Sequence, residues 1–172
     1  MKNAVYDMCA GTFAPMLGTL SQLLDKAAPQ AAKTDLADAK LAPDMFPLML
    51  QVQLACHHAR DAAARLTKQE PPTLPKETET LDQLKARIAR TIEHLNAIEA
   101  DAFDGAKKRK IEFQLQGPAW FEGTGLEFLR DWSLPHFYFH VVTAYDILRN
   151  QGVGLGKRDY MSHIGGHIRQ RG

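Results

Sequence analysis

The segment Thr124–Arg149 reads TGLEFLRDWSLPHFYFHVVTAYDILR and predicts one long helix. Thr124 followed by Glu127 is the capping-box pattern that marks a helix start. Further along, His136 and His140 lie four residues apart, so both imidazoles project from one face. Helical steps from His140 also reach a stripe formed by Leu129, Ser133, Ala144 and Ile147. We therefore expect the histidine pair to face the interior, where imidazoles need polar partners.

Three earlier segments carry apolar residues at spacings of three and four, which is the helical pattern. We expect helices over Asn3–Lys26 and Met45–Thr67, and a third from Thr80 to about Ile98. Gln83, three residues after Thr80, completes another capping box. Four long amphipathic helices predict a bundle.

The first two helices carry proline signals. Pro15 is expected to kink the first helix or loosen one of its turns. Asp44 is the expected N-cap of the second helix, with Pro47 in its first turn. The apolar stripe of this helix is Leu48, Val52, Ala55, Ala59, Ala62 and Leu66.

The connections between helices are predicted from proline, glycine and alternation. Lys33–Pro43 is expected to be a connector with a short turn of helix around Leu36. Glu70–Pro75 is expected to be a stiff, extended linker, because it is the most proline-dense part of the chain. Glycines at 152, 154 and 156 are expected to end the last helix and leave a partly ordered tail.

A strand pattern replaces the helical one before the last helix. Lys110–Leu115 alternates polar and apolar residues, Gly117-Pro118 signals a turn, and Trp120-Phe121 is expected to return as a second strand. The sequence thus predicts an all-α, antiparallel four-helix bundle over residues 1–160, with a small β-hairpin before the last long helix. Residues 161–172 form the expected tail.

Composition narrows the class of protein. The net charge of +1 gives no electrostatic footprint for nucleic acid or an anionic membrane, so neither is an expected partner. No apolar stretch is long enough for a membrane helix, and Asp7 interrupts any early apolar run that a signal peptide would need. Cys9 and Cys56 are too few for a disulfide scaffold. We expect a cytoplasmic protein with reduced thiols.

His136 and His140 are candidate metal ligands, because a pair at this spacing on a helix can share one ion. The same pair is also compatible with two core-edge histidines that only form hydrogen bonds, and Pro135 can rotate the rings apart. Facing ligands are sought on the second helix, where Gln53, His57 and Asp61 stack at four-residue steps. That stack borders either a cleft or solvent, and His58 lies about 100° around the helix from His57.

Other reactive residue types give weaker signals. Cys56 lies near the apolar side of its helix and is expected to be a small core residue. His94 has no partner in sequence, and His163 with His167 is expected to lie in a flexible tail because Gly165-Gly166 separates them. The sequence contains no nucleophile-elbow, P-loop, dinucleotide-binding or HExxH motif.

Several stretches resemble a bacterial domain-of-unknown-function family within the DinB/YfiT-like, metal-binding helical bundles. In chain order they are Leu41–Leu48 (LAPDMFPL), Gln51–Cys56 (QVQLAC), Asp101–Ala106 (DAFDGA), Leu134–Val141 (LPHFYFHV), Tyr145–Arg149 (YDILR) and Gly152–Tyr160 (GVGLGKRDY). Together they cover nearly the whole chain. The resemblance implies a DinB-like four-helix bundle that forms homodimers.

The resemblance also implies a place for a metal. The wider superfamily often holds a divalent ion such as zinc or nickel through one histidine on the second helix and an HxxxH pair on the last. The pair corresponds to His136 and His140, whereas Gln53 stands where the third histidine is expected. Glutamine is a poor ligand beside imidazole, so either His57, one turn further on, replaces it or the site is degenerate.

Two functions follow as hypotheses. The first is a metal-dependent enzyme, similar to the thiol-dependent transferases and isomerase of the superfamily, that takes a thiol as ligand. The second is a non-catalytic dimeric bundle, for small-ligand binding or a stress response, without metal. In that case Trp120, Trp132, Phe137 and Phe139 are candidates to line a cleft, although aromatics at helical spacing are more often core.

Overall fold

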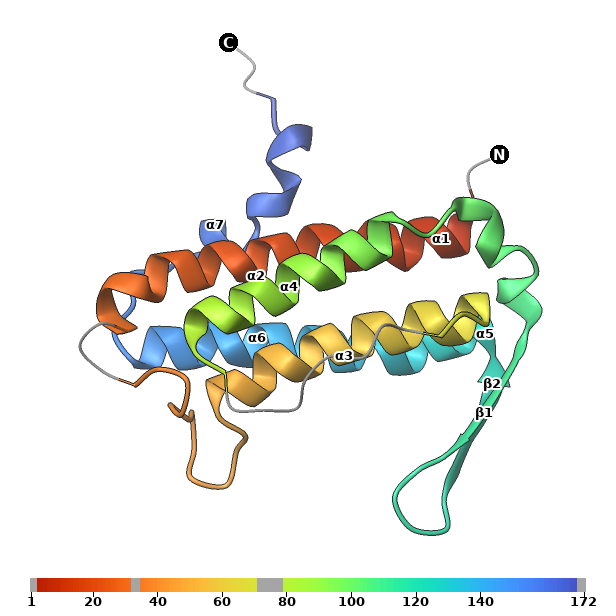
Figure 1. The fold of residues 1–172 in the computed structure, drawn as a ribbon, viewed down its shortest axis with the longest axis horizontal. Coiled ribbons are helices and arrows are strands. Elements are labelled where there is room, and N and C mark those ends of the chain that lie inside the picture. The colour runs from red at the N-terminus through yellow and green to blue at the C-terminus, as the bar shows by residue number, and fades with distance from the viewer. Residues whose placement is uncertain (1–2, 32–34, 71–78, 170–172) are drawn as a thin grey trace.

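Four long helices dominate the fold of the computed structural model, which describes residues 3–31, 35–70 and 79–169. They are α2 (Ala10–Ala31), α3 (Leu48–Thr67), α4 (Leu81–Asn96) and α6 (Leu134–Asn150). In Figure 1, α2 and α4 lie side by side above α3 and α6, and α3 contacts both α6 and α4. The predicted all-α bundle with a hairpin before the last long helix is confirmed.

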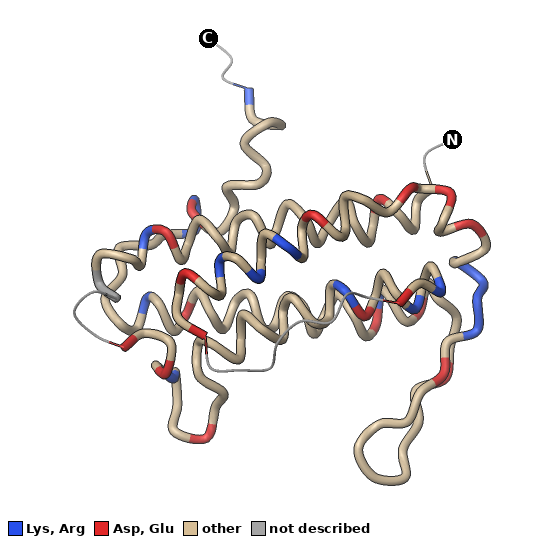
Figure 2. Tube along the Cα trace, in the orientation of Figure 1, with Lys and Arg blue, Asp and Glu red and all other residues tan. Residues whose placement is uncertain are grey.

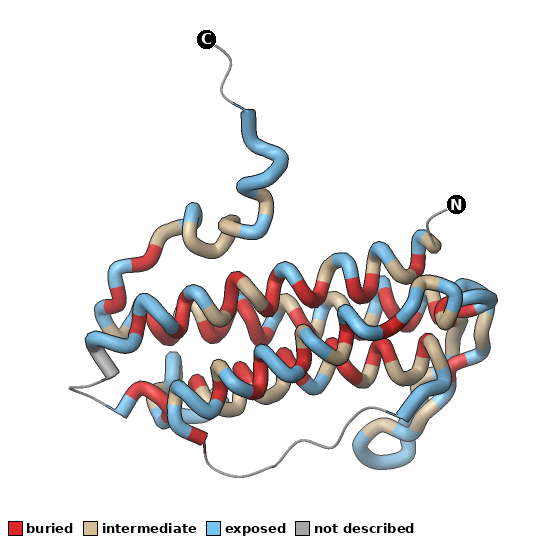
Figure 3. Tube along the Cα trace, turned by 45° about the horizontal axis from the view of Figure 1, so that its top comes forward, coloured by how far each residue is buried: buried red, intermediate tan, exposed pale blue. Residues whose placement is uncertain are grey.

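The core lies between the inner faces of these helices. Figure 3 shows buried and exposed residues alternating along each helix, as an amphipathic pattern requires. The whole predicted stripe of α3 is buried. Four of the buried residues of this helix are alanines, at 55, 59, 62 and 63. Phe13 of α2 and Phe137 of α6 meet edge to face, with ring centroids 4.7 Å apart. The small alanine side chains allow the neighbouring helices to approach α3 closely.

The first predicted helix is divided. It comprises α1 (Ala4–Met8), capped by the side chain of Asn3, and α2, with an interruption at Cys9. The amide of Cys9 is shared between the carbonyls of Val5 and Tyr6, which tightens the turn there. The sequence pattern did not predict this break, whereas the expectation that Pro15 does not end the helix is confirmed. Pro15 removes only one amide donor, and α2 continues through it to Ala31.

The start of the second predicted helix was also wrong by three residues. It begins at Leu48 with Pro47 as N-cap, rather than at Met45 with Asp44 as N-cap. Proline disfavours a helical conformation in the residue before it, which explains why Phe46 stays outside the helix.

No side chain caps the N-terminus of α3, and backbone carbonyls of the preceding connector accept from its first amides instead. The amides of Leu48 and Met49 donate to the carbonyls of Ala39 and Ala37, at 2.9 Å each. Around Leu36 the structure has a hydrogen-bonded turn rather than a turn of helix. The loop is thereby fixed to the N-terminus of α3.

The signals in the second half are confirmed. Both capping boxes are present, Thr80 with Gln83 at α4 and Thr124 with Glu127 at α5 (Gly125–Glu127). Short 3-10 turns η1 (Ala100–Phe103) and η2 (Ala106–Lys108) lead into the hairpin. Its strands β1 (Lys110–Gln114) and β2 (Trp120–Thr124) pair antiparallel, with Phe113 opposite Phe121. In Figure 1 the hairpin extends away from the bundle.

The sequence pattern predicted one uniform helix over this region. The structure instead contains a segment that is not α-helical. Between α5 and α6 lies η3 (Phe128–Ser133), a π-helical segment in which the amide of Leu134 donates to Leu129, five residues back. Pro135 follows at once and has no amide hydrogen to close an ordinary four-residue turn on Asp131. The helix accommodates this proline by widening.

The C-terminal part is more ordered than predicted. It contains α7 (Lys157–Tyr160) and the 3-10 turn η4 (Ser162–His167). The Ser162 and Thr19 hydroxyls are 3.0 Å apart, which ties this part to α2. Most of the proline linker, residues 71–75, lies outside the described residues, as do residues 170–172.

Charges of both signs are interspersed along the helices, as Figure 2 shows. The clearest exception is the basic run Lys107–Lys110 at the entrance to the hairpin. No described helix is both long and apolar enough to cross a membrane.

Gly125 supplies a test of the packing at the start of the last helix. A Cβ there would overlap the Ala106 carbonyl oxygen and lie 2.9 Å from Leu66 Cδ2. We expect Gly125→Ala to lower the free energy of unfolding by about 3 kcal/mol in urea denaturation, because overpacking displaces backbone. Gly18→Ala is the matched control: its Cβ meets nothing within 4 Å, so stability rises by about 1 kcal/mol. Equal effects of the two variants would contradict this packing.

Candidate functional site

Three histidine rings lie together between α3 and the last helix. The His58 ring centroid is 4.8 Å from that of His136 and 5.3 Å from that of His140. His140 is buried, with 7% of its surface exposed, and the other two are half-buried. Pro135 therefore does not separate the pair from a common partner, because both rings contact that of His58.

Gln51 of α3 holds one of these rings. The Nδ1 atom of His140 lies 2.8 Å from Gln51 Oε1, and Gln51 Nε2 donates to the Phe46 carbonyl at 3.0 Å. Because a carbonyl oxygen only accepts, the amide nitrogen must face Phe46 and the amide oxygen must face His140. His140 Nδ1 therefore carries the proton, and Nε2 carries the lone pair.

His136 is held in the same form by the backbone. Its Nδ1 lies 2.8 Å from the Trp132 carbonyl oxygen, which again only accepts. The Trp132 ring lies against the imidazole, with centroids 4.3 Å apart. Both histidines of the pair thus direct Nδ1–H at a fixed acceptor, which in a neutral ring leaves Nε2 as the available ligand or base.

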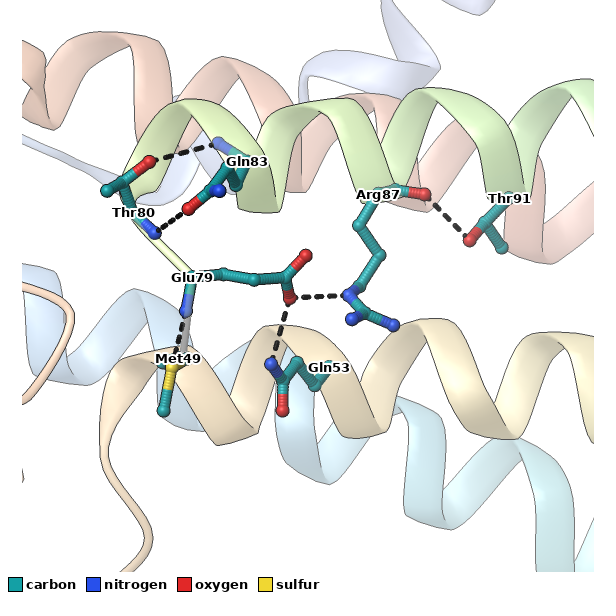
Figure 4. Close-up of polar contacts among 7 residues, drawn as sticks. All are labelled: Met49, Gln53, Glu79, Thr80, Gln83, Arg87 and Thr91. Carbon is teal, nitrogen blue, oxygen red and sulfur yellow. Dashed lines mark hydrogen bonds and ion pairs between the residues drawn. The ribbon is translucent and has the colours of Figure 1, made fainter. Parts of the chain in front are cut away.

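Of the two ligands expected on the second helix, Gln53 lies on the α4 side of α3, whereas His57 borders the cluster and contributes to the lowered pKa values of His58 and His140. Gln53 donates to Glu79 at 2.8 Å, and Arg87 of α4 donates to the same carboxylate oxygen at 2.6 Å. Figure 4 shows this contact on the α4 side of α3. His57 is exposed, and its ring meets that of His58 edge to face at 5.4 Å. The helical-wheel argument therefore missed His58 and Gln51.

Burial decides the charge of His58 and His140. Desolvation, followed by the neighbouring His136 and the other histidines, lowers the pKa of His58 to about 3. Desolvation, followed by the neighbouring His136 and His57, lowers the pKa of His140 to about 4. Both imidazoles are therefore neutral at pH 7, which is the form that ligates metals.

The cluster offers imidazole nitrogens of the kind that bind metal ions. These nitrogens do not yet converge on one point. Among the described residues, no three His, Cys, Asp or Glu side chains already converge as ligands. The His58 and His140 rings are stacked, with 10° between their planes, so a shared ion requires the His58 ring to turn. Within the described ranges, no hydrogen bond holds the His58 ring in place.

The other candidates are structural or lie apart from this cluster. Cys56 is fully buried, and that burial raises the pKa of its thiol to about 11, so it is the expected core residue. Phe137 is buried, whereas Trp120 and Phe139 are more than half exposed, so the four aromatics do not line one cleft. His163 and His167 lie in η4 rather than in an irregular tail.

Comparisons with known proteins identify the family. The family model DUF1993, a domain of unknown function, matches residues 5–161. The chain belongs to the DUF1993 family. A DinB family member protein from Shewanella denitrificans, known from its crystal structure, is 36% identical over 93% of each chain, with a TM-score of 0.83. No curated protein matches. The likeness confirms the resemblance of this DUF1993 chain to DinB-like bundles.

The neutral histidines make the metal-free protein sensitive to acid. Both folded-state pKa values lie below the unfolded value of about 6.5, so acid protonates the unfolded chain first. The contribution of these two histidines to the free energy of unfolding is therefore fully present above about pH 6.5. It falls toward pH 4, by at most about 1.4 kcal/mol per pH unit for each histidine.

Urea denaturation in a chelator between pH 7 and pH 4.5 measures this loss. We expect the double variant His58→Asn/His140→Asn to have a shallower pH dependence. His163→Gln, an exposed histidine in η4, is the control and keeps the wild-type slope. An unchanged slope in the double variant would show that other groups cause the acid sensitivity.

Proposed function

We propose that this protein binds one divalent ion, zinc or nickel, through His58, His136 and His140. The observation that carries the proposal is the cluster of three imidazoles, two of which direct Nδ1–H into fixed hydrogen bonds and so present Nε2 as the ligand atom. His58 takes the place that the resemblance leaves to Gln53 or His57. Imidazole nitrogen suits both metals.

Three protein ligands leave a coordination position open. An ion at such a site supplies Lewis acidity, which favours the deprotonated form of a bound water or thiol. This supports the thiol-dependent transferase or isomerase implied by the resemblance. The chain's own part is to keep Nδ1 protonated on His136 and His140 and to limit access of water, with Trp132 covering one side of His136.

Metal binding to untagged protein tests the proposal. We expect chelator-treated protein to take up one zinc ion per chain in isothermal titration calorimetry. At a free zinc concentration about 100 times the Kd, the free energy of unfolding rises by about 2.7 kcal/mol. His58→Ala and His140→Ala each abolish this stabilisation.

His57→Ala is the matched control, because His57 is the exposed neighbour of His58 on the same helix. It retains wild-type zinc binding if the proposal is right. Loss of zinc binding in His57→Ala but not in His58→Ala would show that His57, rather than His58, is the third ligand. Absence of zinc and nickel binding in the wild type would favour the metal-free, non-catalytic alternative.

We also propose that the protein forms the homodimer implied by the resemblance, through the outer face of α6. Phe139 is 58% exposed and Val142 is 39% exposed, one turn apart on this helix. Val142 also lines a shallow pocket of about 170 Å³ with Tyr145 and Tyr160. That volume is below the range of about 300–1,000 Å³ for small-molecule sites, so the surface suits a protein partner better.

Light scattering coupled to size-exclusion chromatography tests this surface. We expect Phe139→Glu to convert a dimer to a monomer, because the charge must be desolvated at the interface. Trp120→Glu, at an exposed aromatic of the hairpin, is the control and leaves the dimer intact. A monomeric wild type, or a dimeric Phe139→Glu variant, would exclude this interface.

A further inference from the structure

Gln51 is a buried side chain whose amide is engaged at both ends. Only 1% of the residue is exposed. Its Nε2 donates to the Phe46 carbonyl at 3.0 Å, and its Oε1 lies 2.8 Å from His140 Nδ1. A core glutamine is costly unless its polar atoms are satisfied, and here one donor and one acceptor each have a partner.

The amide cannot turn over without losing its contact with Phe46. In the flipped orientation Oε1 would face the Phe46 carbonyl oxygen, which sets two acceptors against each other in a buried site. Nε2 would then face His140 and could donate only to the other tautomer of its ring. The Phe46 carbonyl therefore decides the orientation of the Gln51 amide. That orientation in turn decides which nitrogen of the His140 ring carries the proton.

The Phe46 carbonyl is itself held in place. It belongs to the loop that caps α3, where the amides of Leu48 and Met49 donate to the carbonyls of Ala39 and Ala37. Those four residues fix the loop on the first turn of the helix that carries Gln51. The hydrogen-bond chain thus runs from the backbone of the loop to an imidazole of α6.

Gln53 provides a contrast within the same helix. It is also a glutamine with a buried neighbour, but its amide donates to Glu79 on the α4 side. The two glutamines lie two residues apart, about 200° around the helix, so only Gln51 faces His140.

We infer that Gln51 is a positioning residue: through its hydrogen bonds to Phe46 and His140 it fixes the Nδ1–H form of His140 and directs Nε2 toward the metal. The inference rests on the proposed function only for what Nε2 binds. The fixed tautomer is a property of the metal-free protein. Partners that orient ligating histidines typically change metal affinity by about 10- to 100-fold when they are removed.

Nitrogen-15 NMR of the imidazoles in metal-free protein tests the tautomer directly. We expect wild-type His140 to be protonated at Nδ1, and Gln51→Leu to shift it toward the Nε2–H form, which histidine prefers in water. Gln51→Glu, with its buried carboxyl protonated, keeps both a donor for the Phe46 carbonyl and an acceptor for His140, and so retains the Nδ1–H form. His136 is an internal reference, because its partner is the Trp132 backbone carbonyl and is untouched by these variants.

Gln53→Leu is the matched control and leaves the His140 tautomer unchanged. Far-UV circular dichroism confirms that each variant is folded before the spectra are compared. Retention of Nδ1–H by His140 in folded Gln51→Leu would overturn the inference. So would an Nε2–H tautomer in the wild type.

Zinc titration separates this inference from the proposed function. We expect Gln51→Leu to weaken zinc binding about 10- to 100-fold, with Gln53→Leu unchanged. If the wild type binds no metal but the tautomer shifts in Gln51→Leu, the proposed function fails and the tautomer control by Gln51 stands. If the wild type binds zinc and Gln51→Leu binds it equally well, the positioning role fails and the metal site stands.

Discussion

The packing of α3 against the last helix is the contact on which the histidine site depends. Alanines at 55, 59, 62 and 63 let α3 approach its neighbours, and all four are fully buried. At this separation Gln51 reaches His140 directly, and the His58 ring lies against both histidines of the pair. A larger side chain in the alanine stripe would separate the helices and break the polar contacts first, because hydrogen bonds tolerate little change in distance.

The fold was predictable because its signals are local and repeated. The capping boxes at Thr80 and Thr124, the buried stripe of α3 and the alternation before Trp120 each specify an element without reference to the rest of the chain. The predicted starts and breaks failed where backbone contacts between segments decide. The first amides of α3 find their acceptors at Ala37 and Ala39, which no pattern near Leu48 announces.

The site was harder to predict, and α3 shows why. Its buried stripe has two flanks, one facing α6 and one facing α4. Gln51 and His58, seven residues and two turns apart, lie on the first flank, whereas Gln53 lies on the second. From the sequence the flanks are equivalent, because only the arrangement of the bundle decides which neighbour each one meets. The resemblance pointed to α3 and to the pair on α6, but Gln53, its third position, lies on the flank away from His140.

The widened turn before α6 completes the arrangement of the pair. Pro135 has no amide hydrogen, and the π-helical residues Phe128–Ser133 precede it. In the same region the Trp132 carbonyl accepts the Nδ1 proton of His136. A proline that seemed to weaken the pair thus accompanies the turn that orients one of its rings, while a glutamine on the facing helix orients the other. Backbone on one side and a buried amide on the other fix the Nδ1 protons of both rings. Because burial also keeps His58 and His140 neutral at pH 7, those two rings can lie together without charge repulsion.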